Sequence, residues 1–444
     1  MTSQTKKRSL WNFADRFEGD KVVLIILLML ILFSIVCIFS STSRLLESGQ
    51  TRLDIVRSQL LIVALGLGVI IVCYNIKNIK FFRALSKWGF ALSFVLLLLL
   101  DCGIKTPFVS SVEINGARRI LQVPGLQIHV FEVVKVAMVM YLAWAMDALK
   151  KKEIKWEMSD NLKKAILLYA PFLITFVMVI PGSNSAALFI GAVMFVVILL
   201  GGGNARDLFI LLAVGTAVIG LFVGIYFLNG RQGMGRIGTA IGRVFDNRDW
   251  EQQFLTNRPH SEPWQEALDA MRQPVGAKIA VKEGGILGKG PGQSTQRYVV
   301  PDISEDYMFS FIVEEYGLVG AILVIFMYVS LLARGTIIVR NCGNDLYAKL
   351  SVAGLCILIS GQAFLHMFVN ADLGPMTGQT LPLISHGNSA FLCFSVAFGI
   401  ILSFSRIAAR RIDRETKDAA PLVERREVAQ EDMDNYNEFD DYGV

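Results

Sequence analysis

The sequence predicts an all-α polytopic membrane protein with about ten transmembrane helices and a large extracytoplasmic loop between the seventh and eighth. Hydrophobic residues make up 53% of the 444-residue chain and charged residues only 18%, whereas soluble domains average about 25% charged residues. The mean hydropathy is +0.50. The apolar residues also gather in long runs, most of them near the roughly 20 residues with which a helix crosses a bilayer. This composition excludes a disordered, coiled-coil, collagen-like or disulfide-rich chain.

The expected helices divide the chain into a short N-terminal tail (1–20), a membrane domain (21–405) and a C-terminal tail (406–444). The last stretch of the tail, 427–444, has seven acids and no Lys or Arg, so the tail is expected to be disordered in the cytoplasm. The ten apolar segments lie near residues 21–40, 56–74, 82–100, 130–148, 164–180, 185–200, 206–228, 307–333, 348–369 and 386–405.

Lys and Arg are distributed unequally between the two sets of loops that connect these segments. One set, which includes both tails, is rich in them, as in Lys150, Lys151 and Lys152. The short loops of the opposite set hold only five, which are Arg44, Arg52, Lys105, Arg118 and Arg119. Cytoplasmic loops carry the excess of positive charge, so both termini are expected in the cytoplasm and the number of spans to be even. The net charge of +5 then reflects topology, and no nucleic-acid partner is expected.

The loop over residues 229–306 is the one long connection on the opposite side. It carries Trp250 and Trp264 and a helix-like stretch near 262–273, so an ordered element is expected. Its Gly-rich run, 284–292, lacks the order of a nucleotide-binding loop and is expected to bring backbone close to the membrane or to a lipid diphosphate. The six cysteines form no CxxC pair, which disfavours zinc and redox motifs.

Charged residues within or beside the spans are the candidates for chemistry, because burying charge in a membrane is costly. Glu132 and Lys135 are three residues apart on one helix and can pair, either to fix helix packing or to line a polar cavity that opens outward. Arg118 and Arg119 precede them and suit a diphosphate or a lipid headgroup; ordinary snorkelling is the alternative.

Asp306 lies where the long loop enters the eighth span. As an acid in the first helical turn it could be purely structural. As a carboxylate at the outer rim of a water-filled cavity it could take a proton from a sugar hydroxyl. Glu314 and Glu315 are two turns deeper and need partners, for which Arg119 or Lys135 are candidates. The breaker-rich segment 374–387, with Ser385 and His386, is expected to re-enter the membrane against protein, and His386 to be a structural histidine rather than a base.

Together these motifs resemble the SEDS family of polytopic peptidoglycan glycosyltransferases, which includes the FtsW (division) and RodA (elongation) branches. The resemblance covers nearly all of the chain outside the tails and is carried by five ordered motifs. They are Asn115-Gly116-Ala117-Arg118-Arg119, Glu132 with Lys135, the glycines of 284–290, Pro301 to Asp306 followed by Glu314-Glu315-Tyr316-Gly317, and Thr377 to Gly387. Gly288 to Gly292, Gly378 to Pro382 and Gly19-Asp20-Lys21 look more like FtsW, of the Bacteroidetes type.

The chain departs from the family pattern in five places. His129-Val130-Phe131 replaces Gln-Pro-Ser, and Gly182-Ser183-Asn184 replaces Asp-Phe-Gly. Ile120 and Tyr307 replace Trp and Phe, and His386-Gly387-Asn388 replaces Tyr-Gly-Gly. The first two departures change polar side chains near the expected site.

The resemblance implies polymerisation of lipid II into glycan strands at the outer face of the cytoplasmic (inner) membrane during cell division, with Asp306 as general base. It implies a class B penicillin-binding protein and other divisome membrane proteins as partners. Positive charge for the departing diphosphate would come from basic side chains or from a divalent cation (Mg or Mn). The expected substrate-binding residues are Arg118, Arg119, Glu132, Lys135, Arg243, Lys289, Glu314, Glu315 and Ser385.

Three other functions remain open at this stage. A lipid II flippase would use the same polar cavity without making a bond, although the basic inward loops favour chemistry outside. A RodA-type elongation polymerase would share the chemistry. A scaffold of the division complex would not need Asp306 at all.

Overall fold

Long apolar helices form most of the protein in this computed structural model, which describes residues 17–41, 52–104, 106, 109–114, 117–124, 126–228, 250–374 and 377–440. Each of the ten expected apolar segments lies in helix, within a few residues. The helices of the first half are α2 (Lys21–Ser41), α3 (Arg52–Asn75), α4 (Ile79–Asp101), α5 (Val130–Lys150), α6 (Asp160–Lys164) continued by a π turn (Ala165–Tyr169) and α7 (Ala170–Val179), α8 (Asn184–Leu200) and α9 (Ala205–Leu228). The second half has α11 (Trp250–Thr256), α12 (Glu262–Gly284), a 3-10 turn (Gln296–Tyr298), α13 (Met308–Asn341), α14 (Leu346–Asn370) and α15 (Asn388–Asp440).

Seven helical segments in the described part of the chain are long and apolar enough to cross a membrane. They lie in α2, α3, α4, α6 to α7, α13, α14 and α15. The expected fourth, sixth and seventh spans, α5, α8 and α9, are not among them. The α5 helix carries Glu132, Lys135 and Asp147 along an otherwise apolar sequence, and α8 is only 17 residues long. The total of ten spans stays a prediction.

A small antiparallel sheet departs from the all-α expectation. Strands β1 (Ser110–Ile114), β2 (Ala117–Val123) and β3 (Leu126–His129) pair in the order β1-β2-β3, with Ile120 opposite His129. The β3 strand runs directly into α5, which begins at Val130. The sheet therefore fixes where Arg118 and Arg119 stand relative to the start of that helix.

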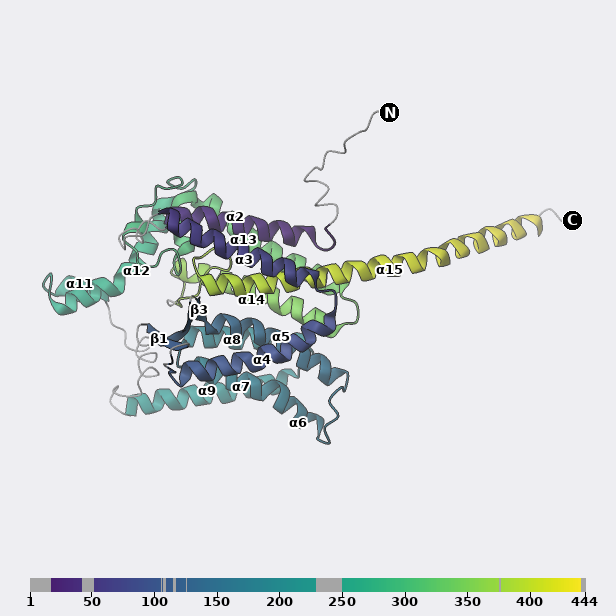
Figure 1. The fold of residues 1–444 in the computed structure, drawn as a ribbon, viewed down its shortest axis with the longest axis horizontal. Coiled ribbons are helices and arrows are strands. Elements are labelled where there is room, and N and C mark those ends of the chain that lie inside the picture. Colours follow the sequence, from purple (N-terminus) through teal and green to yellow (C-terminus); the bar gives the residue numbers. More distant parts are fainter. Residues whose placement is uncertain are drawn as a thin grey trace, which may run out of the picture.

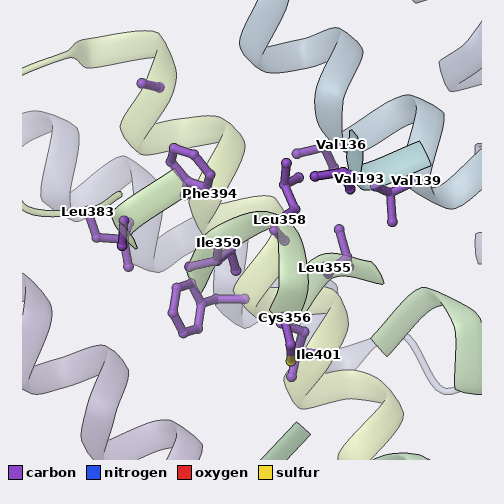
Figure 2. Close-up of a cluster of buried hydrophobic side chains, with 14 of the residues drawn as sticks. Val136, Val139, Val193, Leu355, Cys356, Leu358, Ile359, Leu383, Phe394 and Ile401 are labelled. Carbon is purple, nitrogen blue, oxygen red and sulfur yellow. The ribbon is translucent and has the colours of Figure 1, made fainter. Parts of the chain in front are cut away.

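The buried core lies where α5, α8, α14 and α15 meet. Val136 and Val139 of α5, Val193 of α8, and Leu355 and Leu358 of α14 are at most 8% exposed and pack together (Figure 2). Gly354 allows the close approach, because a side chain there would meet Val139 and Val197. Small residues at helix crossings are how membrane helices gain packing contacts in a solvent as apolar as they are.

The helix bundle has two distinct ends (Figure 1). The sheet and the α11–α12 pair lie at one end, here called the sheet end, and the distal part of α15 projects beyond the other, here called the tail end. The α12 helix is the ordered element expected in the long loop, and it extends past the predicted 262–273 to Gly284. Residues 229–249 of that loop lie outside the described residues.

The C-terminal tail is helical where disorder was expected. The last span continues without interruption as α15 to Asp440. Pairs of opposite charge one turn apart, such as Arg411 and Glu415 at 2.7 Å, support an exposed helix of this composition.

Candidate functional site

Three segments meet at the sheet end: the start of α5 with β2, the turn that precedes α13, and the segment 377–387. The turn closes because the amides of Glu305 and Asp306 donate to the carbonyl of Asp302, at 2.9 and 3.0 Å. Asp302 has φ of +52°, a conformation that Asp tolerates better than most residues. The backbone carbonyl of Asp306 accepts a hydrogen bond from Nδ2 of Asn370 on α14, at 3.1 Å. The turn is thus fixed at both ends.

The side chains of Asp306 and Arg119 border the same small space beside Gly378. A Cβ placed on Gly378 would lie 3.6 Å from Oδ2 of Asp306 and 3.7 Å from Nη1 of Arg119. Gly378 has φ of +59°, so both its conformation and its surroundings favour glycine. Nε of Arg119 donates to the carbonyl of Gly182 at 3.0 Å, which anchors the guanidinium. The predicted base and one predicted cation are therefore brought together.

The environment of Asp306 raises its pKa to about 7. Burial is the largest cause, the carboxylates of Glu305 and Asp302 act in the same direction, and Arg119 opposes them. A general base works best when its pKa lies near the working pH, because it is then ionised and still basic enough to take a proton. The half-buried Asp306 carboxyl has this property, which its sequence position alone does not give.

Arg118 faces away from this space, as successive residues of a strand do. Its Nη1 donates to the carbonyl of Asp101, at the end of α4, at 3.1 Å. The structure brings Arg119 to Asp306 and leaves Arg118 exposed on the opposite face of β2. Asn115, Gly116 and Arg243 lie outside the described residues.

Glu132 and Lys135 form the predicted ion pair, with Lys135 Nζ 2.7 Å from Oε1 of Glu132. The ammonium also donates to the side-chain oxygens of Gln362 on α14 (2.7 Å) and Gln379 (2.8 Å). Lys135 is 1% exposed, so this cation is held entirely by protein groups. Gln379 follows Gly378 directly, which links the buried pair to the space beside Asp306.

Glu314 and Glu315 have partners other than the expected Arg119 and Lys135. Glu314 accepts from Nζ of Lys289 (2.7 Å) and from Oγ of Ser294 (2.5 Å). Glu315 accepts from Oγ of Ser40 on α2 and from the amide of Gly292, at 2.6 and 3.0 Å. Both carboxylates thus bind the Gly-rich loop, which favours a structural role for them and for Lys289.

The Gly-rich loop pairs with the backbone of α13; its approach to the membrane or to a lipid diphosphate stays a prediction. α13 is broken at Gly317, with φ of +66°, and the loop supplies hydrogen bonds across the break. The amides of Lys289 and Gly290 donate to the carbonyls of Glu314 and Glu315, both at 2.9 Å, and the amide of Leu318 donates to the carbonyl of Gly285 at 3.0 Å. Side chains at Gly288 or Gly317 would overlap the opposing backbone. The glycines therefore allow two backbones to pair.

The segment 377–387 is non-helical and buried against protein, as expected; Pro375 and Met376 lie outside the described residues. Oγ of Ser385 accepts from the amide of Leu381 (2.9 Å) and donates to the carbonyl of Glu305 (2.8 Å). Nδ1 of His386 lies 3.4 Å from Oε1 of Glu305. Ser385 and His386 thus hold the segment to the turn that carries Asp306.

Two departures from the family pattern lie against each other. The ring of Phe131 fills the space above Gly182, where any Cβ would overlap it. Phe131, in place of Ser, takes up space that a side chain at position 182 would need, so it goes together with glycine in place of Asp there. The carbonyl of Gly182 still receives Arg119, so the basic side chain keeps a fixed position.

Three buried polar residues on α14 were not identified from the sequence. Gln362, His366 and Asn370 recur every fourth residue and so share one face of a mostly apolar helix. Polar residues repeated at this spacing within an apolar span could have indicated a buried polar face. Among the residues that the structure describes, no group of three or more His, Cys, Asp or Glu could hold a metal ion, and the divalent cation stays a prediction.

Comparison with known proteins gives consistent matches along the chain. The family of cell cycle proteins that comprises FtsW, RodA and SpoVE matches residues 20–410. Stage V sporulation protein E of Bacillus subtilis is 26% identical over 391 residues, covering 87% of this chain and 97% of the relative. A probable peptidoglycan glycosyltransferase FtsW from a Geobacter species is 27% identical over 401 residues, covering 88% and 98%.

Two solved structures share the fold at 20% identity. One, from a study of how a peptidoglycan synthase complex coordinates polymerization and crosslinking, aligns with a TM-score of 0.62 over 88% of this chain and 98% of its own. The other, the rod shape determining protein RodA of Thermus thermophilus, aligns with a TM-score of 0.58 over the same shares.

Proposed function

The chain belongs to the FtsW, RodA and SpoVE family of cell cycle proteins, and from this membership we propose that it is a peptidoglycan glycosyltransferase that polymerises lipid II. Relatives named as FtsW glycosyltransferases match almost from end to end, which supports the enzyme class and a place in cell division. A multi-pass membrane protein is also what the apolar helices indicate.

The reaction needs a base, and Asp306 is the group proposed for it. Its carboxylate takes the proton of the 4-hydroxyl of the acceptor sugar, and that oxygen attacks the anomeric carbon of the donor. The bond between that carbon and the lipid diphosphate breaks with inversion, and the diphosphate leaves with the electron pair. Arg119 lies close enough to the same space to stabilise the charge that develops on the diphosphate.

The observation that carries the proposal is the juxtaposition of Asp306 and Arg119 beside Gly378, together with a pKa of Asp306 raised to about 7. Glu132 and Lys135 contribute through Gln379, which Lys135 holds one residue from Gly378. Direct roles for Arg118, Lys289, Glu314, Glu315 and Ser385 in binding substrate have weaker support, since all of them bind other parts of the chain.

The proposal places the sheet end at the outer face of the inner membrane and both termini in the cytoplasm, because the tail-end loops carry most Lys and Arg. The expected partner is a class B penicillin-binding protein that cross-links the product. Support comes from the solved complex in which polymerization and crosslinking are coordinated, whose polymerase fold this chain shares.

The test is a glycan-chain gel assay with lipid II on the purified full chain and its partner transpeptidase. Asp306→Asn is expected to abolish polymerisation while partner binding persists. The matched control is Asp372→Asn. Asp372 is an exposed carboxylate that pairs with Lys278 at 2.6 Å, and like Asp302 it has a positive φ. This variant should polymerise lipid II normally. Full activity of Asp306→Asn would refute the general-base role, and transport of lipid II by an inactive wild type would favour a flippase.

A further inference from the structure

The polar face of α14 supplies hydrogen bonds to the segment 377–387 and to the start of α13. Gln362, His366 and Asn370 are each at most 2% exposed. Burying such groups is unfavourable unless each polar atom finds a partner. All three find partners in the segment 377–387, in α5 or at the start of α13, and these are the parts of the chain that form the candidate site.

The start of α13 lacks a cap of its own. The N-cap residue is Tyr307, whose side chain makes no capping hydrogen bond. The first amides of a helix have no partner within it and need one from elsewhere. The amide of Phe309 donates to Nε2 of His366 at 3.3 Å, and the amide of Ser310 donates to Oδ1 of Asn370 at 2.9 Å. A neighbouring helix therefore caps the helix that begins two residues after Asp306.

His366 has a second bond, which reaches the segment on the other side of the site. Its Nδ1 lies 2.6 Å from the carbonyl oxygen of Gln379. A carbonyl can only accept and an amide can only donate, so Nδ1 carries the proton and Nε2 is bare. One neutral imidazole thus connects the residue after Gly378 with the first turn of α13.

The neighbouring members of the polar face complete the connection. Nε2 of Gln362 donates to the carbonyl of Thr380 at 3.0 Å, and its oxygen accepts from Lys135. Nδ2 of Asn370 donates to the carbonyl of Asp306. A continuous series of hydrogen bonds therefore runs from Lys135 to Asp306, and His366 is the member that joins the two segments directly.

We propose that His366 is a positioning residue for glycosyl transfer: by binding Gln379 and Phe309 at once, it sets how far Gly378 stands from the turn that carries Asp306. This proposal rests on the transferase function. An apolar residue of similar size would fill the same volume but leave the Gln379 carbonyl and the Phe309 amide without His366 as partner. Ser385 would still hold the far end of the segment to the turn, but the end that carries Gly378 would move away from the start of α13. Asp306 and Arg119 would then no longer border one space.

The test compares three variants of the full-length protein with its partner. His366→Leu removes both bonds. His366→Asn places an amide nitrogen near the position of Nδ1 and keeps the bond to Gln379. Ser360→Ala is the matched control, because Ser360 is also buried on α14 but bonds to the backbone carbonyl of Tyr328, in the part of α13 beyond Gly317, at 3.1 Å. Polymerisation kinetics and amide hydrogen exchange are measured on each.

We expect His366→Leu to lower kcat at least tenfold and to change KM for lipid II less than threefold. Amide exchange over 377–387 and 308–311 should rise at least tenfold, since protection reports local opening. His366→Asn should keep the protection of 377–387 and at least a third of kcat. Ser360→Ala should match the wild type in both measurements.

Two results would overturn the positioning role. One is a His366→Leu protein with wild-type kcat and wild-type exchange. The other is an equal loss of kcat in His366→Leu and Ser360→Ala, which would indicate a general loss of stability. A wild type that makes no glycan would refute the transferase proposal instead, and the exchange comparison would still show whether His366 holds the two segments.

Discussion

The ammonium of Lys135 lies 2.7 Å from the carboxylate of Glu132 in a region where neither side chain is more than 11% exposed. One carboxylate oxygen, Oε2 of Glu132, is buried without a hydrogen bond in the structure. Removing one partner of a buried pair leaves the other charge uncompensated, which is costlier than removing both. The pair is therefore sensitive to single substitutions.

Lys135→Met is expected to reduce polymerisation at least tenfold, about 1.4 kcal/mol of barrier, and to destabilise the protein by roughly 3–5 kcal/mol. The double variant Glu132→Gln, Lys135→Met should recover much of the stability but not the activity, because Gln379 still loses its cation. Thermal unfolding and the gel assay measure the two effects. An unchanged rate in Lys135→Met would make the pair purely structural.

The rate should depend on pH through Asp306. Its pKa is raised to about 7, so the carboxylate is protonated and inactive as a base below that pH. We expect kcat/KM to fall tenfold per pH unit well below pH 7 and to level off above it. The measurement is kcat/KM from pH 5 to 8.5. A profile flat down to pH 5 would contradict a base with this pKa.

The same burial should make Asp306 unfavourable for folding at high pH. A carboxyl whose pKa is raised in the folded state contributes stability only while protonated, and this contribution is lost as pH rises from about 4 towards 7. Asp306→Asn should therefore melt a few degrees above the wild type at pH 8 and by a smaller margin at pH 5. Equal melting temperatures at pH 8 would show that the charged form is well solvated.

Gly317→Ala is expected to disturb the short helix that precedes the break in α13, and to leave the part of α13 after Gly317 intact. The new Cβ would overlap the carbonyl of Ile286, and φ of +66° would be strained. Polymerisation should fall at least tenfold. Gly215→Ala, at a position on α9 where a Cβ meets no atom within 4 Å, is the matched control. Wild-type activity of Gly317→Ala would mean that the break in α13 is dispensable.

Gly354→Val tests the packing of the core. A valine would overlap Val139 and Val197, so α14 must move away from α5 and α8. We expect a loss of about 1–3 kcal/mol in stability. The same substitution at Gly220 on α9, where a Cβ meets no atom within 4 Å, should cost much less. Denaturation of the purified variants in detergent compares them.

The orientation in the membrane is tested by labelling single cysteines in intact cells. A cysteine at position 250, at the start of α11, should react with an impermeant reagent added outside. A cysteine at position 152, after α5, should react only after the membrane is opened. The reverse pattern would place the sheet end in the cytoplasm.

Features set by local composition could be predicted from the sequence. The ten apolar segments coincide with helices because hydropathy is local, and Glu132 and Lys135 pair because three residues bring them to one face. The closeness of Asp306 and Arg119 was not derivable from spacing, since they are 187 positions apart in the chain. The family resemblance singled out both, and the structure shows the space that they share.

Features that depend on tertiary contacts could not be predicted. From the sequence, the glycines of 284–292 fit a loop that approaches a ligand as well as one that pairs with another backbone. The pairing partner, the broken part of α13 at Gly317, is apparent only in the structure. The sheet is short and β2 carries charged residues, so its strands lack the clear alternation of apolar and polar residues that would predict them. The partners of Glu314 and Glu315 follow from the same loop and were misassigned for the same reason.

The break at Gly317 has a mechanical consequence. The short helix from Met308 to Tyr316 is joined to the Gly-rich loop by hydrogen bonds of both backbone and carboxylates, but it is separated from the remaining length of α13 by a non-helical residue. The same loop also accepts from the amide of Leu318, beyond the break, so a protein that pulled on α12 would load both parts of α13. The non-helical residue between them lets the short helix next to Asp306 tilt relative to the longer part. The turn that carries Asp306 would respond to force applied at the surface.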